Sequence, residues 1–169
     1  MMDKEQMRLY LWEIEEQCRY ALKAWRLIQS PRTDVDTEPW YSIQAFLVAT
    51  ANISKFLWPI PEREARGKQL REFLSVQDDS PLKRRKVRDS FEHFDERLDS
   101  WISSGKGDHL GRIYGPADLL KFKPEDNAHV YDPRTGRLAL FGEEYDIREA
   151  VKEIERLHSI LREEPESLR

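Results

Sequence analysis

The first 66 residues of the chain contain no glycine, and apolar side chains recur along them with helical spacing. From Met7 to Ile28 these side chains follow one another at alternating steps of four and three residues, which places them on one face of a helix. We therefore predict a helix over about residues 3–29. It should end at Ser30-Pro31, because the residue before a proline avoids the helical region. A long stretch without glycine favours a helical fold over a turn-rich β fold.

The rest of the chain shows four more helical patterns and one hairpin pattern. Helix-start signals stand at Thr37 and at Ser80-Pro81. Apolar spacing predicts helices over about residues 37–57, 67–76, 81–103 and 145–163. Two β-prone runs flank the turn-forming segment 132–136 and predict a β-hairpin within about residues 128–142. Residues 105–127 show no regular pattern.

These elements predict an all-α fold class, a four- to five-helix bundle with a small β-hairpin before the last helix. A length of 169 residues fits one domain with a sizeable core. We therefore expect a single domain over residues 1–169, whose last residues, 162–169, form a frayed tail.

Composition and charge narrow the class of protein. The net charge is −4, so any binding to phosphate must come from a local basic patch. The single cysteine, Cys18, falls on the apolar stripe of the first helix and is interpreted as a core residue. No apolar run approaches the length of a membrane span, and the N-terminus has no signal-peptide pattern. We expect a cytoplasmic protein that does not bind membranes.

The chain has four histidines, and three of them have structural interpretations. His109 and His129 are expected at the surface, without cysteines or clustered carboxylates at metal-ligand spacing. Glu155 and His158 form one Glu-x-x-His step, whereas a di-iron bundle needs that step twice and two further glutamates. We therefore predict no metal and no cofactor, and interpret His158 as a core or boundary residue.

A basic run opens the helix that is predicted to start at Pro81. It consists of Lys83, Arg84, Arg85 and Lys86. Positive charges at a helix N-terminus oppose the macrodipole, at a cost of about 0.3–1 kcal/mol for each exposed charge. The run is either a set of solvated surface charges or a local patch that binds RNA phosphates or another anion.

Arg88, Asp89 and His93 follow on the same predicted helix. Arginine is a permanent cation whose fork suits phosphate oxygens, and histidine can give and take a proton near neutral pH. Asp89 precedes His93 by four residues on one helix face, so its carboxylate could orient the imidazole. The three residues form a minimal set for phosphoryl transfer without a metal.

The segment from Arg88 to His93, RDSFEH, resembles the signature of the HEPN superfamily: an arginine, a polar residue and then a histidine. Members are small helical bundles found in toxin–antitoxin systems, CRISPR effectors and other defence ribonucleases. The resemblance implies a metal-independent endoribonuclease, in which the ribose 2′-hydroxyl attacks the adjacent phosphorus. The products are a 2′,3′-cyclic phosphate and a 5′-hydroxyl.

The resemblance also implies a role for each site residue. Arg88 would stabilise the charge of the phosphorane. His93 would be the general acid or base, or would position the phosphate. Asp89 would be the orienting polar residue, in place of the more frequent asparagine. The predicted hairpin of residues 128–142 does not belong to the common core of the superfamily.

Helix geometry predicts how such a site is assembled. Five residues along a helix rotate by about 140°, so Arg88 and His93 point in different directions. Two such helices that cross at a two-fold axis would bring two arginines and two histidines into one cleft. We therefore expect a homodimer with a composite site, as the resemblance also implies. That cleft would also contain the negative charges of Asp89, Glu92 and Asp95, and the positive charges of the basic run would offset them.

Three functions stay open at this point. The first is a dimeric endoribonuclease that acts on RNA as a toxin or defence protein. The second is a non-catalytic HEPN-like module that binds nucleotide, RNA or a protein partner such as an antitoxin, and the acidic net charge favours it. The third is structural: Arg88 pairs with Glu92 and His93 with Asp89, and each pair stabilises the helix by about 0.2–0.5 kcal/mol.

Overall fold

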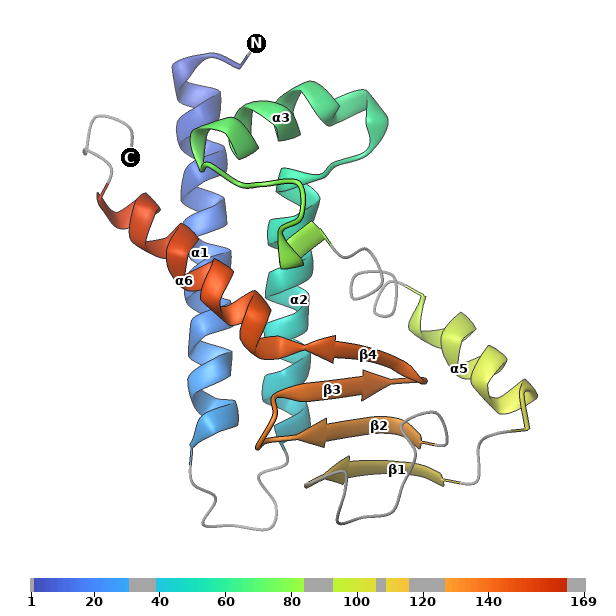
Figure 1. The fold of residues 1–169 in the computed structure, drawn as a ribbon. Helices are drawn as coiled ribbons and strands as arrows, with labels where there is room; N and C mark the ends of the chain where they lie inside the picture. The colour runs from blue at the N-terminus through green and yellow to red at the C-terminus, as the bar shows by residue number, and fades with distance from the viewer. Residues whose placement is uncertain (1, 31–38, 84–92, 106–108, 116–126, 164–169) are drawn as a thin grey trace. The chain divides into compact units, whose positions relative to one another are not determined.

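The computed structural model of the chain describes residues 2–30, 39–83, 93–105, 109–115 and 127–163 (Figure 1). The described part is mostly helical, and a four-stranded sheet precedes the last helix. Its α-helices are α1 (Lys4–Gln29), α2 (Pro39–Leu57), α3 (Glu64–Phe73), α5 (Phe94–Ser103) and α6 (Ile147–Glu163). The other described elements are the 3₁₀ helices η1 (Pro61–Arg63) and η2 (Pro81–Lys83) and the strands β1 (His109–Tyr114), β2 (Asn127–Asp132), β3 (Arg137–Leu140) and β4 (Glu143–Asp146).

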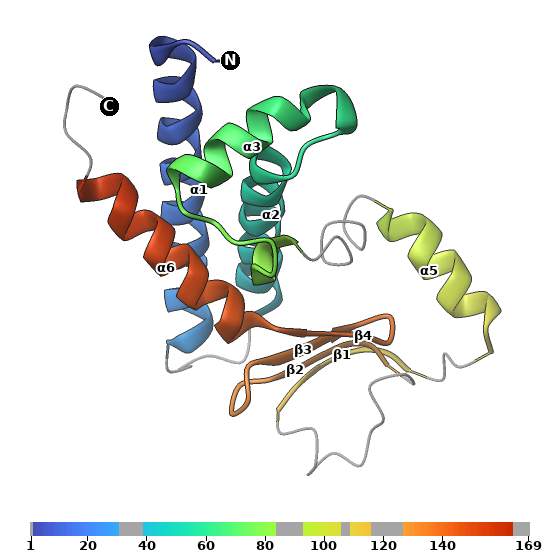
Figure 2. The ribbon, with the colours of Figure 1, turned by 45° about the horizontal axis from the view of Figure 1, so that its top comes forward.

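The chain divides into two compact units, and each is described by itself. The helical unit comprises residues 1–31, 41–84 and 150–169, and the sheet unit comprises residues 32–40 and 85–149. Figure 2 shows the helices of the helical unit, α1, α2, α3 and α6, from a second direction. That residues 1–169 form a single domain stays a prediction.

Helix α1 confirms the first predicted helix, and a capping box closes its N-terminus. The Asp3 carboxylate accepts a hydrogen bond from the backbone N–H of Gln6 at 2.8 Å. In return, the Gln6 side-chain oxygen accepts one from the backbone N–H of Asp3 at 3.2 Å. Backbone donors at a helix start have no partner within the helix, so this exchange stabilises the first turn.

Helices α1 and α2 run antiparallel in the helical unit. Three contacts show this direction: the rings of Tyr10 and Phe56 lie 5.9 Å apart, Asn52 donates a hydrogen bond to Gln17 at 3.2 Å, and the rings of Trp25 and Phe46 lie 6.4 Å apart. The contacts that lie later in α1 therefore involve earlier residues of α2. The predicted apolar faces are buried, with Leu11, Ile14, Cys18, Ala21 and Ile28 on α1, Ile43, Phe46, Leu47, Ile53 and Leu57 on α2, and Val151, Ile154, Leu157 and Leu161 on α6. The core therefore follows from the helical periodicity.

Gly67, in α3, lies where the chain after α2 packs back on itself. A Cβ atom at this position would lie 2.4 Å from Pro59 Cδ and 2.7 Å from the carbonyl oxygen of Leu57. Helix α3 itself starts at Glu64, earlier than the predicted residues 67–76. Only glycine leaves room for this approach, because the atoms that a side chain would meet include backbone.

We expect Gly67→Ala to lower the free energy of unfolding by about 1–3 kcal/mol, since the added methyl overpacks the site. Helix propensity alone predicts the opposite sign, because alanine stabilises a helix interior by about 1 kcal/mol relative to glycine. Urea unfolding gives the sign directly. Lys68→Ala, at an exposed position of the same helix, should stay within about 0.5 kcal/mol of wild type. A stabilised Gly67→Ala variant would contradict the packing described here.

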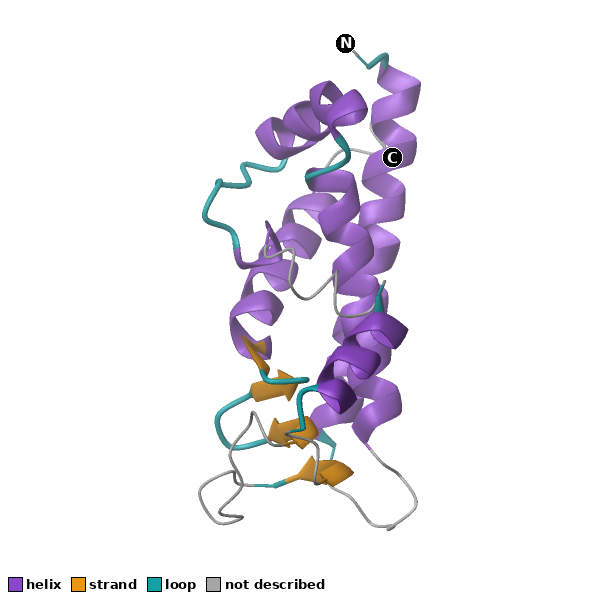
Figure 3. Ribbon diagram, turned by 90° about the vertical axis from the view of Figure 1, so that its right-hand side faces the viewer, coloured by secondary structure: helices purple, strands orange, loops and turns teal. Residues whose placement is uncertain are grey.

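The sheet has the strand order β1-β2-β3-β4, as labelled in Figure 1, and Figure 3 shows its strands in orange from a third direction. Strands β2 and β3 pair antiparallel and confirm the hairpin predicted over residues 128–142. Strand β4 adds antiparallel to β3, and β1 adds parallel to β2. The prediction of one small hairpin was therefore too narrow. The strand β1 lies in the segment that was expected to be irregular, and β4 takes the residues expected to start the last helix.

The turn between β2 and β3 forms as its sequence predicts. Asp132 Oδ1 accepts a hydrogen bond from the Arg134 N–H at 2.9 Å, and the Gly136 N–H donates to the Asp132 carbonyl at 2.8 Å. Gly136 has a φ of 78°, a conformation that favours glycine. Arg148 of α6 donates to the carbonyls of Pro133 at 3.1 Å and Arg134 at 2.7 Å, which ties the turn to the first residues of α6.

The helix predicted over residues 81–103 is not continuous. Pro81–Lys83 form the 3₁₀ helix η2, and α5 starts only at Phe94. His93 precedes α5 with a φ of −120° and a ψ of 42°, outside the α-helical region. The apolar spacing missed this break, because a helical period can resume in the same phase after a non-helical residue. The predicted end of the helix at Ser103 is confirmed.

The predicted tail, residues 162–169, is in part helical. Residues 162 and 163 belong to the last turn of α6. The remainder of the tail lies outside the described residues.

Candidate functional site

Two of the seven predicted site residues lie in described segments. Lys83 ends η2 in the helical unit, is exposed, and has its Nζ 3.1 Å from Asp78 Oδ1. His93 lies in the sheet unit. The predicted residues that lie outside the described ranges are Arg84, Arg85, Lys86, Arg88 and Asp89. His93 is therefore the predicted catalytic residue whose surroundings the structure gives.

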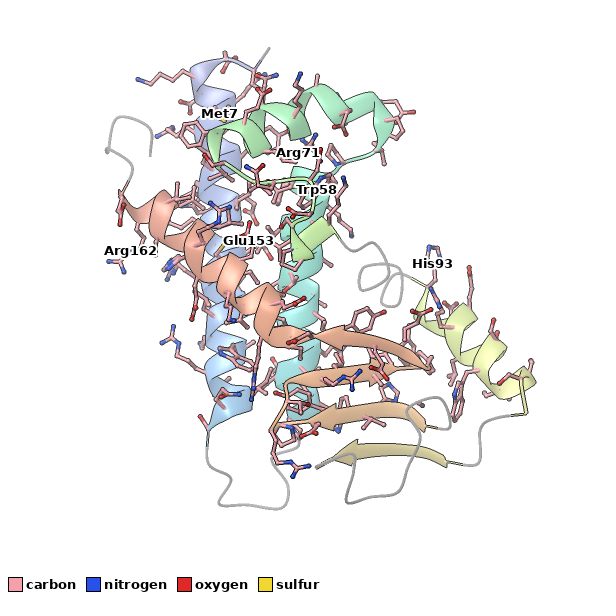
Figure 4. All side chains as sticks on the ribbon, in the orientation of Figure 1. Met7, Trp58, Arg71, His93, Glu153 and Arg162 are labelled. Carbon is pink, nitrogen blue, oxygen red and sulfur yellow. The ribbon has the colours of Figure 1, made fainter. Side chains whose placement is uncertain are left out.

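His93 is the N-cap residue of α5, and its side chain is 55% exposed. Figure 4 shows the side chain at the very start of the helix, directed away from the helix axis. It makes no capping hydrogen bond to the first turn. The imidazole is therefore accessible to solvent.

Among the described residues, Glu96 is a carboxylate that the structure places beside the His93 ring. His93 Nδ1 lies 3.5 Å from Glu96 Oε1, an ion-pair distance when the imidazole is protonated. The two residues are three apart, at the N-cap and in the first turn of α5. Sequence reasoning missed Glu96, although a His-x-x-Glu step at a helix start was the signal that could have found it.

The predicted alignment of Asp89 with His93 needs correction. That prediction placed both residues on one face of a single helix, four residues apart. Because α5 begins at Phe94, the helical spacing no longer relates His93 to Asp89. The 140° rotation between Arg88 and His93 assumed the same continuous helix and is withdrawn for the same reason.

Acidic residues stand at the start of α5 for a structural reason as well. Asp95 and Glu96 occupy its first turn, where the macrodipole favours negative charge. Of the acids that were predicted to enter the site, Asp95 lies in this first turn, whereas Asp89 and Glu92 lie outside the described residues. The contribution of Asp95 to helix stability does not depend on catalysis.

Aromatic side chains hold the start of α5 against the sheet. The Phe94 ring lies 5.4 Å from that of Phe141 and 6.2 Å from that of His129, and Trp101 lies 6.3 Å from Phe141. The Trp40 ring lies 5.5 Å from that of His129. This aromatic cluster fixes Phe94, the residue next to His93, and so sets the position of the His93 backbone within the sheet unit. His129 was expected at the surface but is half-buried in this cluster.

Cys18 is not a candidate nucleophile. Its side chain is fully buried in the helical unit, and burial raises the pKa of its thiol to about 12. The thiol therefore stays protonated at neutral pH, which confirms the interpretation of Cys18 as a core residue. His158 is half-buried on α6, at the boundary of the core.

Metal-ligating side chains do not gather anywhere in the described ranges, since no group of three or more His, Cys, Asp or Glu residues is placed to hold an ion there. Within the same ranges, no helix combines the length and the apolar character that crossing a membrane requires. Comparisons of the chain with protein-family models, curated proteins and solved structures find no match. The chemistry of the site is therefore argued from its own residues.

Proposed function

We propose that the protein is a metal-independent endoribonuclease of HEPN type, a helix-bundle enzyme whose site combines Arg88 and His93 across a homodimer. The observation that carries the proposal is the exposed imidazole of His93 at the head of α5, with the Glu96 carboxylate 3.5 Å from its Nδ1. The arginine of the motif stands five residues earlier in the sequence.

The two nitrogens of His93 have different surroundings. Nδ1 lies toward Glu96, so Nε2 is the nitrogen that would meet the substrate. As a general base, Nε2 would take the proton of the ribose 2′-hydroxyl while the 2′-oxygen forms a bond to phosphorus. The bond from phosphorus to the 5′-oxygen then breaks, and that oxygen takes a proton from solvent water to leave as a 5′-hydroxyl, while the imidazolium returns its proton to the hydroxide that forms. The carboxylate of Glu96 stabilises the imidazolium that forms in the first step.

Arg88 supplies the positive charge that the reaction needs. Negative charge builds up on the phosphorane oxygens, and a guanidinium can donate two parallel hydrogen bonds to them. The acidic first turn of α5 makes such a cation more important, because Asp95 and Glu96 repel the RNA backbone. The basic run Lys83 to Lys86 would guide the RNA through its phosphates.

Incubation of uniform RNA substrates in the presence of EDTA tests the proposal. We expect cleavage to continue, with 2′,3′-cyclic phosphate and 5′-hydroxyl ends that are identified by mass spectrometry. A product with a 3′-hydroxyl and a 5′-phosphate would contradict 2′-hydroxyl attack. Loss of cleavage on adding EDTA, with recovery on adding a divalent metal ion, would also contradict the proposal.

We expect Glu96→Ala to lower kcat for RNA cleavage by about 2- to 5-fold, the usual worth of one exposed ion pair. KM should fall only slightly, because the loss of one exposed carboxylate removes a small part of the repulsion of the RNA backbone. Glu96→Gln keeps an oxygen acceptor, and its kcat should lie between those of wild type and Glu96→Ala. A drop in KM for Glu96→Ala without a loss in kcat would show that Glu96 merely repels RNA.

The second candidate function is a non-catalytic HEPN-like module that binds nucleotide, RNA or a protein partner such as an antitoxin. The acidic first turn of α5 beside His93 favours the protein-binding form of this module, because carboxylates there oppose the approach of a polyanion such as RNA. Gel-shift and pull-down measurements that find a bound RNA or protein, without cleavage products, would support this function over the first. A cytoplasmic location stays a prediction for either function.

A further inference from the structure

Helix α1 carries a second apolar stripe that the helical unit does not bury. Leu9, Trp12, Tyr20 and Leu27 are each more than half exposed. At 100° per residue they fall within about 80° of the helix circumference. The buried residues of α1, such as Ile14 and Cys18, lie on the other side of the helix.

The composition of this exposed stripe is that of a protein interface. Single exposed apolar residues are ordinary on a protein surface. Four of them in line on one helix, two of them aromatic, form the kind of patch that marks an association site. The line from Leu9 to Leu27 is about 27 Å long at 1.5 Å per residue.

Two pairs of residues on this face of α1 lie symmetrically about residue 18, whereas the positions symmetric to Trp12 and Tyr20 are Ala24 and Glu16. Leu9 and Leu27 each lie nine residues from that position, and Glu13 and Lys23 each lie five residues from it. Two α1 helices that pair antiparallel about a two-fold axis there would bring each residue of such a pair against the other residue in the second copy. Leucine would meet leucine, and glutamate would meet lysine.

The charges along α1 are complementary in the same sense. Residues 3–16 contain five acidic and two basic residues, whereas residues 17–29 contain three basic residues and no acidic one. Antiparallel pairing places the acidic half of one helix against the basic half of the other. A parallel pair would place like charges together along the whole helix.

The helix macrodipole accounts for only part of this charge pattern. It favours acids in the first turn and bases in the last turn, and its effect fades beyond them. Glu13 and Lys23 lie more than a turn from either end of α1. The dipole therefore does not account for their opposite charges, whereas antiparallel pairing of two copies would place each charge opposite its complement.

We infer that α1 is a self-association surface, on which the exposed stripe of a second copy of this chain docks antiparallel. The stripe lies in the helical unit and His93 in the sheet unit, so the inference does not rest on ribonuclease activity. Its test measures association alone and leaves the proposed site residues unchanged.

Sedimentation velocity at about 1–100 µM protein gives the first test. Wild-type protein should form dimers. Leu27→Glu and Trp12→Glu should each raise Kd by about 30-fold or more, since an apolar residue of the stripe becomes a charge. The matched control is Tyr41→Glu, which changes an 80% exposed aromatic residue of α2. A monomeric wild type, or a dimer that neither stripe variant weakens, would overturn the inference.

Charge exchange distinguishes a second copy from any other partner. Glu13→Lys and Lys23→Glu should each weaken the dimer, because each leaves like charges opposed across the two-fold axis. The double variant restores both pairs and should restore a Kd close to that of wild type. If the double variant is weaker than both single variants, the predicted pairing is wrong.

Cross-linking gives the direction of the pair. Leu9→Cys protein mixed with Leu27→Cys protein should form a disulfide between the two variants, whereas neither variant alone should form one with itself. The native Cys18 does not interfere, because its thiol is fully buried and its pKa is raised to about 12. Rapid self-linking of Leu9→Cys would show a parallel arrangement and overturn the antiparallel one.

Discussion

Replacing His93 with alanine is expected to lower kcat for RNA cleavage by about 10²- to 10⁴-fold, the usual contribution of one general acid or base. The variant should fold like wild type, because the side chain is 55% exposed and does not cap α5. KM should change much less, because the imidazole acts in the proton transfer of the transition state and contributes little to RNA binding. Initial rates on a fluorogenic RNA in EDTA measure both constants.

Arg88→Ala is the companion variant and should lower kcat by about 10²- to 10³-fold, through loss of charge stabilisation on the phosphorane. The matched controls are Arg63→Ala and His158→Ala, which remove the same kinds of side chain from the helical unit. Both controls should retain activity within about 2-fold of wild type. Cleavage that persists at the wild-type rate in both site variants would remove His93 and Arg88 from the mechanism.

Mixing the two inactive variants tests the composite site. If Arg88 of one copy acts with His93 of the other, a mixed dimer contains one intact pair, and up to about a quarter of the wild-type activity should return. If both residues act from the same chain, the mixture should stay inactive. The experiment therefore decides whether dimerisation is part of catalysis, independently of which surface holds the dimer together.

Phe46→Ala should produce the largest loss of stability, about 3–5 kcal/mol in the free energy of unfolding. Phe46 is 1% exposed on α2, and its ring lies 6.4 Å from that of Trp25 on α1. Removing the ring therefore leaves a cavity between the two longest helices. The Thr50 hydroxyl donates to the Phe46 carbonyl at 2.8 Å, which keeps the backbone in place and limits its collapse into that cavity.

Urea denaturation, followed by tryptophan fluorescence and circular dichroism, measures this loss. Tyr41→Ala, at an 80% exposed position of the same helix, is the control and should stay within about 0.5 kcal/mol of wild type. A small effect for Phe46→Ala would mean that α1 and α2 do not pack through this face.

The helical unit could be predicted almost completely from the sequence. The apolar residues of α1, α2 and α6 recur at helical spacing, and the structure buries all residues of those stripes except Met7 and Trp25, which are half-buried. Proline and capping residues placed the helix ends within a few positions. These features are local, so they are visible without knowledge of the fold.

Of the sheet, the sequence predicted only the hairpin of β2 and β3. Asp132 and Gly136 indicate the turn between β2 and β3, because their preferences for turn conformations depend only on neighbouring residues. Strand β1 pairs parallel with β2, and its formation depends on hydrogen bonds to a segment distant in sequence. No local signal reports such a pairing, which is why the segment was expected to be irregular.

The same division holds for the candidate site. By itself the sequence determined which residue types are available: an arginine, an aspartate and a histidine in a motif that resembles a ribonuclease signature. Only the tertiary structure decided that His93 stands at the N-cap position of α5, that Phe94 anchors this helix on the aromatic cluster, and that Glu96 lies beside the imidazole. Helical periodicity fixes the phase of side chains within a helix, whereas the residue at which a helix begins depends on the long-range packing that holds its first turn.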